Sequence, residues 1–566
     1  MNNIFKNNIK EAELFGTASN LNNFSIRNNN EVYAYWSKNT IIPTGNLYFA
    51  SNVNLNGANG LWLKIKDHDL SDTVLYGLNS NETLSGNLNL MIENCIMKNA
   101  SFGGSYNSTI NNDLNIKLKN VTCTGAFMGT NTDVLGNFNF EFTDLTIEKT
   151  KYFYIGPFFK PGSANITYNV NDINVKLNSG IIKANFTPGL CVNNSSRANI
   201  TVNAGNINVI LNGGQTYLND DSNSFFCGGN LLKNKVSSFV ANYNSINVII
   251  NGGKWFDSVN LINGVGIFAG PVCGKGTANI NNVYMELNGG NVSTLFGGGY
   301  PQSSFIVNIL NDVNIVINNG TIGNILGMST ISTSTDNDIG TNHTFGNVYI
   351  HINGGNILSL VHPGVRHRNK IDSNQEMLDG EGYVIISGNT NYSCNFQGNV
   401  LHEETTSTPD CHLIFENYNG SIHNGAEIIG FKDIQFRKNT SVNFDVTFTN
   451  NTNTWTIDLS RRDVDYNNIP IINFINSLSN LSGFNIELIL SESNVLTDYL
   501  IISDEDSTIL NNFSNKTIQV KYNDETIYTG SMFSSNTPFT ISNQDSIFNN
   551  YGFITDESSI RFGKKV

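Results

Sequence analysis

Val348-Tyr-Ile-His-Ile-Asn-Gly-Gly355 is the clearest copy of a phrase that recurs along this chain of 566 residues. Val283-Tyr-Met-Glu-Leu-Asn-Gly-Gly290 is a second copy. Successive copies begin 24 to 39 residues apart, and they start at Leu88, Leu114, Phe138, Ile173, Ile207, Ile246, Val283, Val313 and Val348. Self-similarity at such a period is typical of repeat proteins, in which one unit cannot bury its apolar side alone and stacks on its neighbours.

Each phrase has the pattern of a β-strand. Its first, third and fifth residues are apolar, as in Ile207, Val209 and Leu211, so these side chains share one face of a strand. The Asn-Gly-Gly ending supplies the left-handed backbone of a sharp bend. A short inward element such as Phe296-Gly-Gly-Gly299 and a variable polar stretch complete the unit. We therefore predict an all-β fold, a parallel β-helix of about a dozen coils.

The main alternative fold is a β-sandwich. It would need turn signals about every 8–12 residues without a longer period above them. The repeat suggests three regions: an N-terminal cap at residues 1–45 with a short helix from Ile4 to Leu14, β-helix repeats at 46–460, and closing coils or a small β cap at 461–566. Caps are expected because open strand edges would template aggregation.

Composition excludes several classes of partner. Only 14% of residues are charged and the net charge is -14, so the chain lacks the basic surface that nucleic acids require. No apolar run is long enough for a membrane-spanning helix, and no classical signal peptide is visible at the start. Seven cysteines without a CxxC pair predict buried thiols rather than disulfides or zinc ligands.

The Asn-Gly-Gly phrases followed by Phe-Gly-Gly corners, over roughly residues 46–460, resemble the right-handed parallel β-helix proteins of the pectin-lyase-like class. Within that class the chain is similar to adhesin-like bacterial surface proteins and phage tailspikes. The resemblance implies a right-handed helix, an extracellular, cell-surface or virion location, and a polysaccharide or surface glycan as partner. It does not fix the activity, because this scaffold carries adhesion, lyase, hydrolase and structural roles.

The outward positions of the phrase are free of core packing, so we expect function there. The first outward residue is Asn in most units, which predicts a ladder of amides bonded along the stack. Tyr284 and Tyr349 replace Asn at this position. At the second outward position, Ile210, Ile249 and Val316 leave an apolar strip. Either the polar stretch of each unit covers this strip, or another subunit does, as in a homotrimer.

Seven of the eight histidines lie between His343 and His423, and His362-Pro-Gly-Val-Arg-His-Arg-Asn-Lys370 stands where other units carry Phe-Gly-Gly. Such a break in the internal repeat points to function. The candidate catalytic residues are Arg366, Arg368, Asp372, Glu376, Asp379, Glu381, Glu403 and Glu404. The candidate ligand-binding residues are His351, His362, His367, Tyr284, Tyr300 and Tyr349.

Three interpretations of this break remain open. A glycosidase would use two of the carboxylates, and a lyase would use an arginine or lysine beside a sugar carboxylate with His or Lys as base. The third is a metal site, which would need His together with carboxylates. A solvated loop without chemistry is the alternative to all three. No cofactor motif, HExxH or comparable metal spacing appears. Asp67–Asp72 and Asp336–Asp338 have the density of oxygen ligands expected of a calcium loop, but both lack the full EF-hand spacing.

These observations give three hypotheses for function. Low charge, a long rod and a repeated outer surface favour an adhesin or receptor-binding protein that recognises glycans. The histidine-rich break favours a polysaccharide-degrading lyase or hydrolase. The apolar strip favours a structural spike or fibre.

Overall fold

The computed structural model describes residues 26–27, 31–51, 53, 55, 57–104, 108–125, 127–128, 133–148, 152–159, 166–192, 199–216, 225–231, 238–255, 266–273, 276–301, 305–328, 341–364, 376–398, 410–449, 453–475, 484–494, 498–505, 516–531, 547–548, 551–556 and 558–564. Within them the protein is all-β, with a large sheet whose strands pair mostly in parallel. The helix expected from Ile4 to Leu14 lies outside the described residues. No helix among the described residues is long and apolar enough to cross a bilayer.

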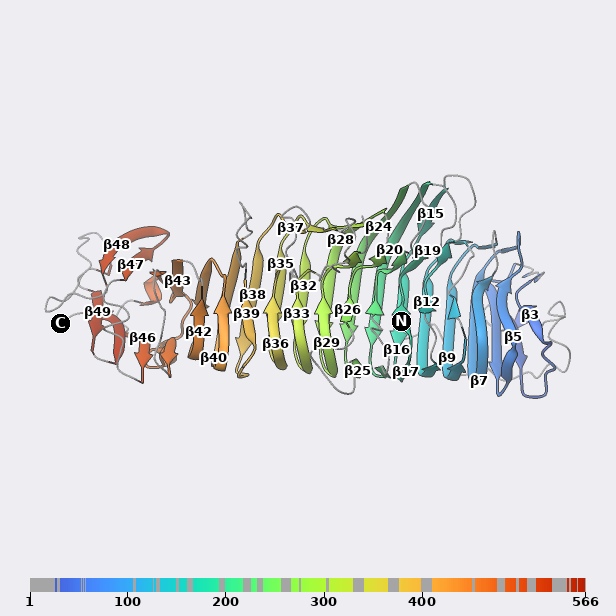
Figure 1. The fold of residues 1–566 in the computed structure, drawn as a ribbon, viewed down its shortest axis with the longest axis horizontal. Coiled ribbons are helices and arrows are strands. Elements are labelled where there is room, and N and C mark those ends of the chain that lie inside the picture. The colour runs from blue at the N-terminus through green and yellow to red at the C-terminus, as the bar shows by residue number, and fades with distance from the viewer. Residues whose placement is uncertain are drawn as a thin grey trace, which may run out of the picture.

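The recurring phrase forms one continuous row of parallel strands, called here the phrase strands. Their order in space follows their order in sequence, and Val209, Val248 and Met285 are register partners on three successive strands. Figure 1 shows them side by side along one long axis of the molecule. The row comprises β2 (Glu31–Trp36), β4 (Gly60–Lys66), β7 (Asn87–Gly104), β9 (Leu114–Cys123), β12 (Phe138–Ile147), β16 (Ile173–Leu177), β20 (Asn199–Leu211), β24 (Ser238–Ile250), β28 (Gly276–Leu287), β32 (Val313–Ile317), β35 (Val348–Ile352), β38 (Gly382–Gly388), β40 (Cys411–Ile429), β41 (Asp433–Arg437), β43 (Asn453–Asp458), β45 (Phe484–Leu490) and β47 (Thr517–Tyr522).

After the glycine bend the chain forms shorter strands, called here the return strands, which also stack in parallel. They are β3 (Gly45–Tyr48), β5 (Asp69–Leu78), β10 (Phe127–Met128), β13 (Tyr152–Tyr154), β17 (Gly180–Ile182), β18 (Asn185–Thr187), β21 (Gln215–Thr216), β22 (Phe225–Phe226), β25 (Lys254–Trp255), β26 (Gly266–Phe268), β29 (Asn291–Phe296), β33 (Thr321–Leu326), β36 (Asn356–His362) and β39 (Asn395–Gln397). Further parallel strands precede some phrase strands: β15 (Ile166–Val170), β31 (Phe305–Ile309), β34 (Thr341–Thr344) and β37 (Glu376–Leu378).

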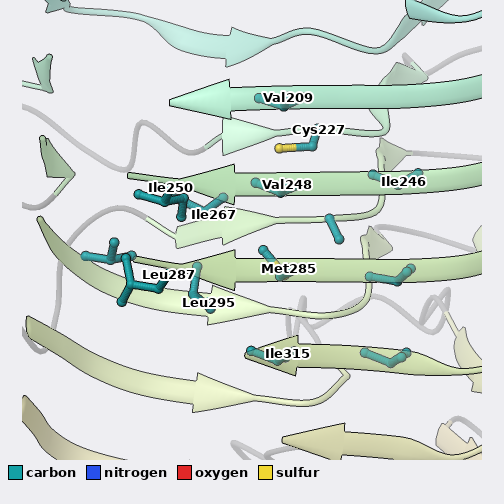
Figure 2. Close-up of a cluster of buried hydrophobic side chains, with 14 of the residues drawn as sticks. Val209, Cys227, Ile246, Val248, Ile250, Ile267, Met285, Leu287, Leu295 and Ile315 are labelled. Carbon is teal, nitrogen blue, oxygen red and sulfur yellow. The ribbon is translucent and has the colours of Figure 1, made fainter. Parts of the chain in front are cut away.

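The core lies between the phrase strands and the return strands. Figure 2 shows Val209, Val248, Met285 and Ile315 in successive layers, with Ile267 and Leu295 supplied by return strands that run the opposite way. These side chains are all fully buried. Each buried aliphatic side chain contributes about 1.5–3 kcal/mol. The alternation predicted from the phrase is therefore the alternation of core and surface in the structure.

The second glycine of the bend is required by two constraints. Gly290 has φ +85°, a conformation that L side chains rarely adopt. A Cβ at Gly290 would lie 2.7 Å from the backbone of Gly252 and Gly253 in the preceding unit. Stacked bends thus approach each other too closely for any side chain.

A second apolar cluster lies outside the main core. It contains Phe226, Phe268, Phe296, Leu326, Leu360 and Val272, with Tyr300 packed against it. The rings of Phe268 and Phe296 stack at 4.1 Å with an interplanar angle of 3°. The inward direction predicted for the Phe-Gly-Gly element holds at Phe102, which lies in the main core. At Phe296 it does not hold, because the adjacent Leu295 fills the main core and Phe296 faces this second cluster.

Two small sheets complete the parallel strands: one joins β6 (Thr83–Leu84), β8 (Thr109–Ile110) and β11 (Asp133–Val134), the other β14 (Phe158–Phe159), β19 (Leu190–Val192), β23 (Gly229–Leu231), β27 (Val272–Cys273) and β30 (Tyr300–Pro301). Antiparallel pairs among the described strands occur only near the chain ends. At the start, β1 (Ile26–Arg27) pairs with β2.

Beyond residue 460 the parallel stacking continues as far as β47. Antiparallel pairing then joins β47 to β48 (Glu525–Ser531), and β50 (Ser559–Lys564) to β46 (Tyr499–Asp504) and β49 (Tyr551–Thr555). β42 (Ser441–Thr449) precedes this region and pairs in parallel with β40 and with β44 (Ile472–Phe474). The 3-10 turns η2 (Val464–Tyr466) and η3 (Glu492–Asn494) also lie beyond residue 460.

Candidate functional site

The first outward position of the phrase strands carries the predicted Asn ladder. Asn115 Nδ2 donates to Asn89 Oδ1 at 2.7 Å, and Asn139 Nδ2 donates to Asn115 Oδ1 at 2.7 Å. The same bond recurs at 2.8 Å for Asn174, Asn208 and Asn247. Each amide donates to one neighbour and accepts from the other, so the Asn side chains satisfy one another's hydrogen-bonding groups. The structural interpretation of these Asn residues is confirmed.

Two further Asn ladders run parallel to the first. The Asn residues at the phrase ends bond at 2.8–3.0 Å in the series Asn178, Asn212, Asn251, Asn288, Asn318 and Asn353. A third series bonds at 2.8–2.9 Å through Asn169, Asn203, Asn242, Asn279 and Asn308. The surface formed by these ladders is neutral and rich in hydrogen-bonding groups.

The bonds of the first ladder reach Asn247, after which Tyr284 and Asn314 follow in register, and a different set of residues begins at β35. In register after Asn314 come Tyr349 on β35, Tyr383 on β38, His412 on β40 and Asp433 on β41. We call these four residues the Tyr–His column. The rings of Tyr349 and Tyr383 stack at 5.0 Å, and those of Tyr383 and His412 at 4.8 Å. Ring stacking replaces the amide bonds as the side-chain contact between neighbouring strands.

His412 is held between two carboxylates. Its Nδ1 lies 2.7 Å from Asp433 Oδ2, and because an ionised carboxylate only accepts, Nδ1 donates. Its Nε2 lies 3.6 Å from Glu381 Oε2, outside hydrogen-bonding distance, and has no hydrogen-bond partner within the described chain. The residue is 7% exposed. His412 is therefore covered from solvent, and Glu381 is the more accessible neighbour of its Nε2.

Glu381 is the accessible group of this site, since its side chain is 44% exposed. The Tyr383 hydroxyl donates to Glu381 Oε2, and the Glu381 N–H donates to Asn347 Oδ1 at 2.9 Å. Asn347 also donates from Nδ2 to the Tyr349 hydroxyl at 2.8 Å. Burial and the Glu381 carboxylate raise the pKa of Tyr383 well above that of an ordinary tyrosine, so its hydroxyl remains a donor.

A charged pair borders the column. Lys432 Nζ forms an ion pair with the Asp410 carboxylate, and about half of each side chain is exposed. The hydrogen bond to Asp410 raises the pKa of Lys432, and the charges of Glu381 and Asp433 act in the same direction. The site thus presents a fixed carboxylate, phenol edges and an ammonium, groups that bind hydroxyl, amide or amine substituents.

Stacking limits what the aromatic rings offer to a sugar. Tyr349 and Tyr383 are inclined by 10°, and Tyr383 and His412 by 18°, so each ring of the pair covers a face of its neighbour. Flat sugar stacking requires a free ring face. The column therefore presents its ring edges and hydroxyls, together with Glu381, rather than a broad aromatic platform.

Several candidate residues lie outside the described chain: Arg366, His367, Arg368, Asp372, Glu403, Glu404 and the Asp336–Asp338 loop. Glu376 begins β37, and its side chain is not among those described. Asp379 lies apart from the column contacts and pairs with His343 Nε2 at 2.9 Å. In the loop from Asp67, Asp69 Oδ1 accepts the Ser71 N–H at 2.9 Å. Among the described residues no group of three or more His, Cys, Asp and Glu is arranged to hold a metal ion.

The candidate ligand-binding residues divide between two surfaces. His351 neighbours Tyr349 on β35 with ring centroids 6.2 Å apart. Burial lowers the pKa of His351, with Glu416 acting in the opposite direction. Tyr284 lies further along the same row, where its hydroxyl donates to Glu286 at 3.1 Å. Tyr300 packs 5.5 Å from Phe268 in the second apolar cluster.

His362 has a different environment. It is 3% exposed, it is the register partner of Leu326, and its Nδ1 lies 2.8 Å from the Gln397 carbonyl oxygen. The unit in which His362 replaces the corner residue therefore ends the apolar row of the second cluster with a hydrogen bond to the next unit.

Sequence reasoning did not assign Tyr383, His412 or Asp433 to a site. Continuing the register of the phrase beyond Val348 would have placed Tyr383 and His412 in the column of Tyr349, because Tyr383-Val-Ile-Ile and His412-Leu-Ile-Phe keep the alternation. Comparisons with protein-family models, curated proteins and solved structures find no match.

Proposed function

We propose that the chain is a right-handed parallel β-helix of about a dozen coils with a cap at each end. On this proposal it is an adhesin or receptor-binding protein of a cell surface or virion, and it recognises a polysaccharide or surface glycan. The in-register parallel stacking supports the architecture. The resemblance of the Asn-Gly-Gly phrases to pectin-lyase-like proteins supports the handedness and the location.

The observation that carries the glycan proposal is the replacement of the Asn ladder by the Tyr–His column beside Glu381. The ladder amides bond to one another, whereas the exposed Glu381 carboxylate accepts from the Tyr383 hydroxyl and the Glu381 backbone N–H donates to Asn347. A fixed carboxylate with neighbouring phenols and amides suits the hydroxyl groups of a sugar. The low charge of the whole chain, 14% of residues, favours such hydrogen-bonded recognition over a charged interface.

The test is retention of the protein on a panel of bacterial and host polysaccharides. Glu381→Gln keeps the size of the side chain and removes its charge, so the affinity for the retained glycan should fall about tenfold or more. Glu148→Gln is the matched control, because Glu148 is 41% exposed and pairs with Lys183 at 2.9 Å on distant coils. Equal affinity for both variants, or no retention on any glycan, would contradict the proposal.

A second candidate is a polysaccharide-degrading enzyme. The arrangement Asp433, His412 and Glu381 favours it, because a histidine oriented by one carboxylate lies beside another that reaches solvent. The same panel is scored for cleavage products. Cleavage that disappears in Glu381→Gln and Asp433→Asn supports the enzyme, and retention without cleavage supports the binder. If neither occurs, a structural spike built on the strip of Ile210, Ile249 and Val316 becomes the better account.

A further inference from the structure

The charge around the Tyr–His column is negative. Three carboxylates, those of Glu381, Asp410 and Asp433, surround the single ammonium of Lys432. Of two other cations on neighbouring positions, Lys438 is paired with Glu416 at 2.8 Å. The Arg437 guanidinium donates to Gln435, which in turn donates to Asp433 at 2.8 Å, so three carboxylates face two cations, Lys432 and Arg437, and the balance stays negative. An anionic ligand would meet like charge here, and a cationic ligand would meet opposite charge.

The Lys432 side chain shows that an ammonium group fits beside these carboxylates. Its ammonium is paired with Asp410 and feels the fields of Glu381 and Asp433, while its side chain remains 54% exposed. Lysine is a compact point charge on a flexible stem, so it can leave this position for another ammonium.

An independent observation points at the same place. His412 is more than nine-tenths buried, and its Nε2 faces Glu381 Oε2 at 3.6 Å without a hydrogen bond in the described structure. Buried polar atoms are rarely left unpaired. The Glu381 carboxylate accepts one hydrogen bond from the Tyr383 hydroxyl and retains acceptor positions for a ligand donor.

Resting on the proposed function, we infer that the glycan bound at Glu381 carries a free amino group, so that the ligand is a hexosamine polymer rather than a uronate or sialate. Its ammonium binds between Glu381 and Asp410 and takes the place of Lys432 Nζ. The neighbouring hydroxyls of the sugar bond to Asn347 and the phenols of the column.

The test compares oligomers of equal length made of glucosamine, N-acetylglucosamine and galacturonate, titrated against the full chain at neutral pH. Glucosamine oligomers should bind about tenfold tighter than their N-acetylated counterparts, and galacturonate oligomers most weakly. Added salt should reduce this difference. Glu381→Gln should abolish the preference for the amine, and Lys432→Met should strengthen amine binding because the competing ammonium is removed.

The outcomes separate the two proposals. Equal affinity for glucosamine and N-acetylglucosamine oligomers, tighter binding of galacturonate, or a preference that survives Glu381→Gln would overturn the amino-sugar inference and leave glycan binding standing. A lysine-rich peptide that binds as tightly as the glucosamine oligomer would overturn it in favour of protein recognition. The absence of retention on every glycan of the wider panel would overturn both.

Discussion

Asn115→Ala tests the claim that the Asn ladder stabilises the stack. Asn115 donates to Asn89 and accepts from Asn139, both at 2.7 Å. Asn89 is 3% exposed and Asn139 is 8% exposed, so water cannot replace the lost bonds. Each buried polar group left unpaired costs about 1–3 kcal/mol. The two partners left unpaired, Asn89 and Asn139, therefore predict a local loss of about 2–6 kcal/mol of stability.

Asn203→Ala is the matched control. Asn203 donates to Asn169 at 2.9 Å and accepts from Asn242 at 2.8 Å, so the substitution removes the same two kinds of bond. Both of these bonds are solvent-exposed. Water satisfies the partners that remain, and the expected loss is about 1 kcal/mol or less.

Native-state hydrogen exchange is the appropriate assay, because long repeat arrays do not unfold as one two-state unit. Exchange protection is measured by mass spectrometry on peptides that cover β9 and β12 for Asn115→Ala, and β20 and β24 for Asn203→Ala. If the two variants lose equal protection, or Asn203→Ala loses more, burial does not decide the strength of the ladder and the reasoning is wrong.

Two further predictions concern the corner glycines and the thiols. Gly229 has φ +117°, and a Cβ there would lie 1.9 Å from a backbone oxygen, so Gly229→Ala should abolish soluble folded protein. Gly425 has φ +73° with open space around it, so Gly425→Ala should reduce the stability by only about 1–2 kcal/mol. Equal melting temperatures of the two variants would contradict this reasoning. Burial raises the pKa of Cys95 to about 11 and that of Cys123 to about 12. Unfolded thiols ionise near pH 8.5 while these remain protonated, so folding stability should fall as the pH rises from about 8 to 11, and alkylation at about pH 8 should label them only in urea.

The sequence predicted the sheet and its core well, because a period of two leaves no choice of face. Once Ile207, Val209 and Leu211 share one side of a strand, any stacking that buries them also places Asn208 outside. The parallel pairing followed from repeated units of similar length. Whether Phe296 or Leu295 fills the main core could not be read from the sequence, because both are apolar and the second cluster consists of similar residues.

The site was harder to predict, because its residues come from units of unequal length. Val348, Gly382 and Cys411 begin successive phrase strands, and the pairing between β38 and β40 shifts register after Ile386. His412 lies near the start of β40, and the chain bends within β40 at Asn417, which has φ +52°. The sequence does not reveal this bend, and without it Asp433 cannot be placed next to His412. Tyr349 and Glu381 are among the predicted candidates, and His412 belongs to the predicted histidine-rich stretch, but its place between Glu381 and Asp433 was not predicted.

The point at which the Asn ladder stops has a physical meaning. An Asn amide can both donate and accept along the stack, so one Asn is the best neighbour for another. Where Tyr284 alone replaces Asn, its hydroxyl donates a hydrogen bond to Glu286 on the same strand. From Tyr349 to Asp433 four successive units depart from Asn, and each departure forfeits a ladder bond that ring stacking only partly replaces. If stability alone determined these four positions, Asn would occupy them. We therefore explain the side chains that replace Asn by the groups that they present at the surface: the carboxylate of Glu381, the phenol edges, and the carboxylates around Lys432.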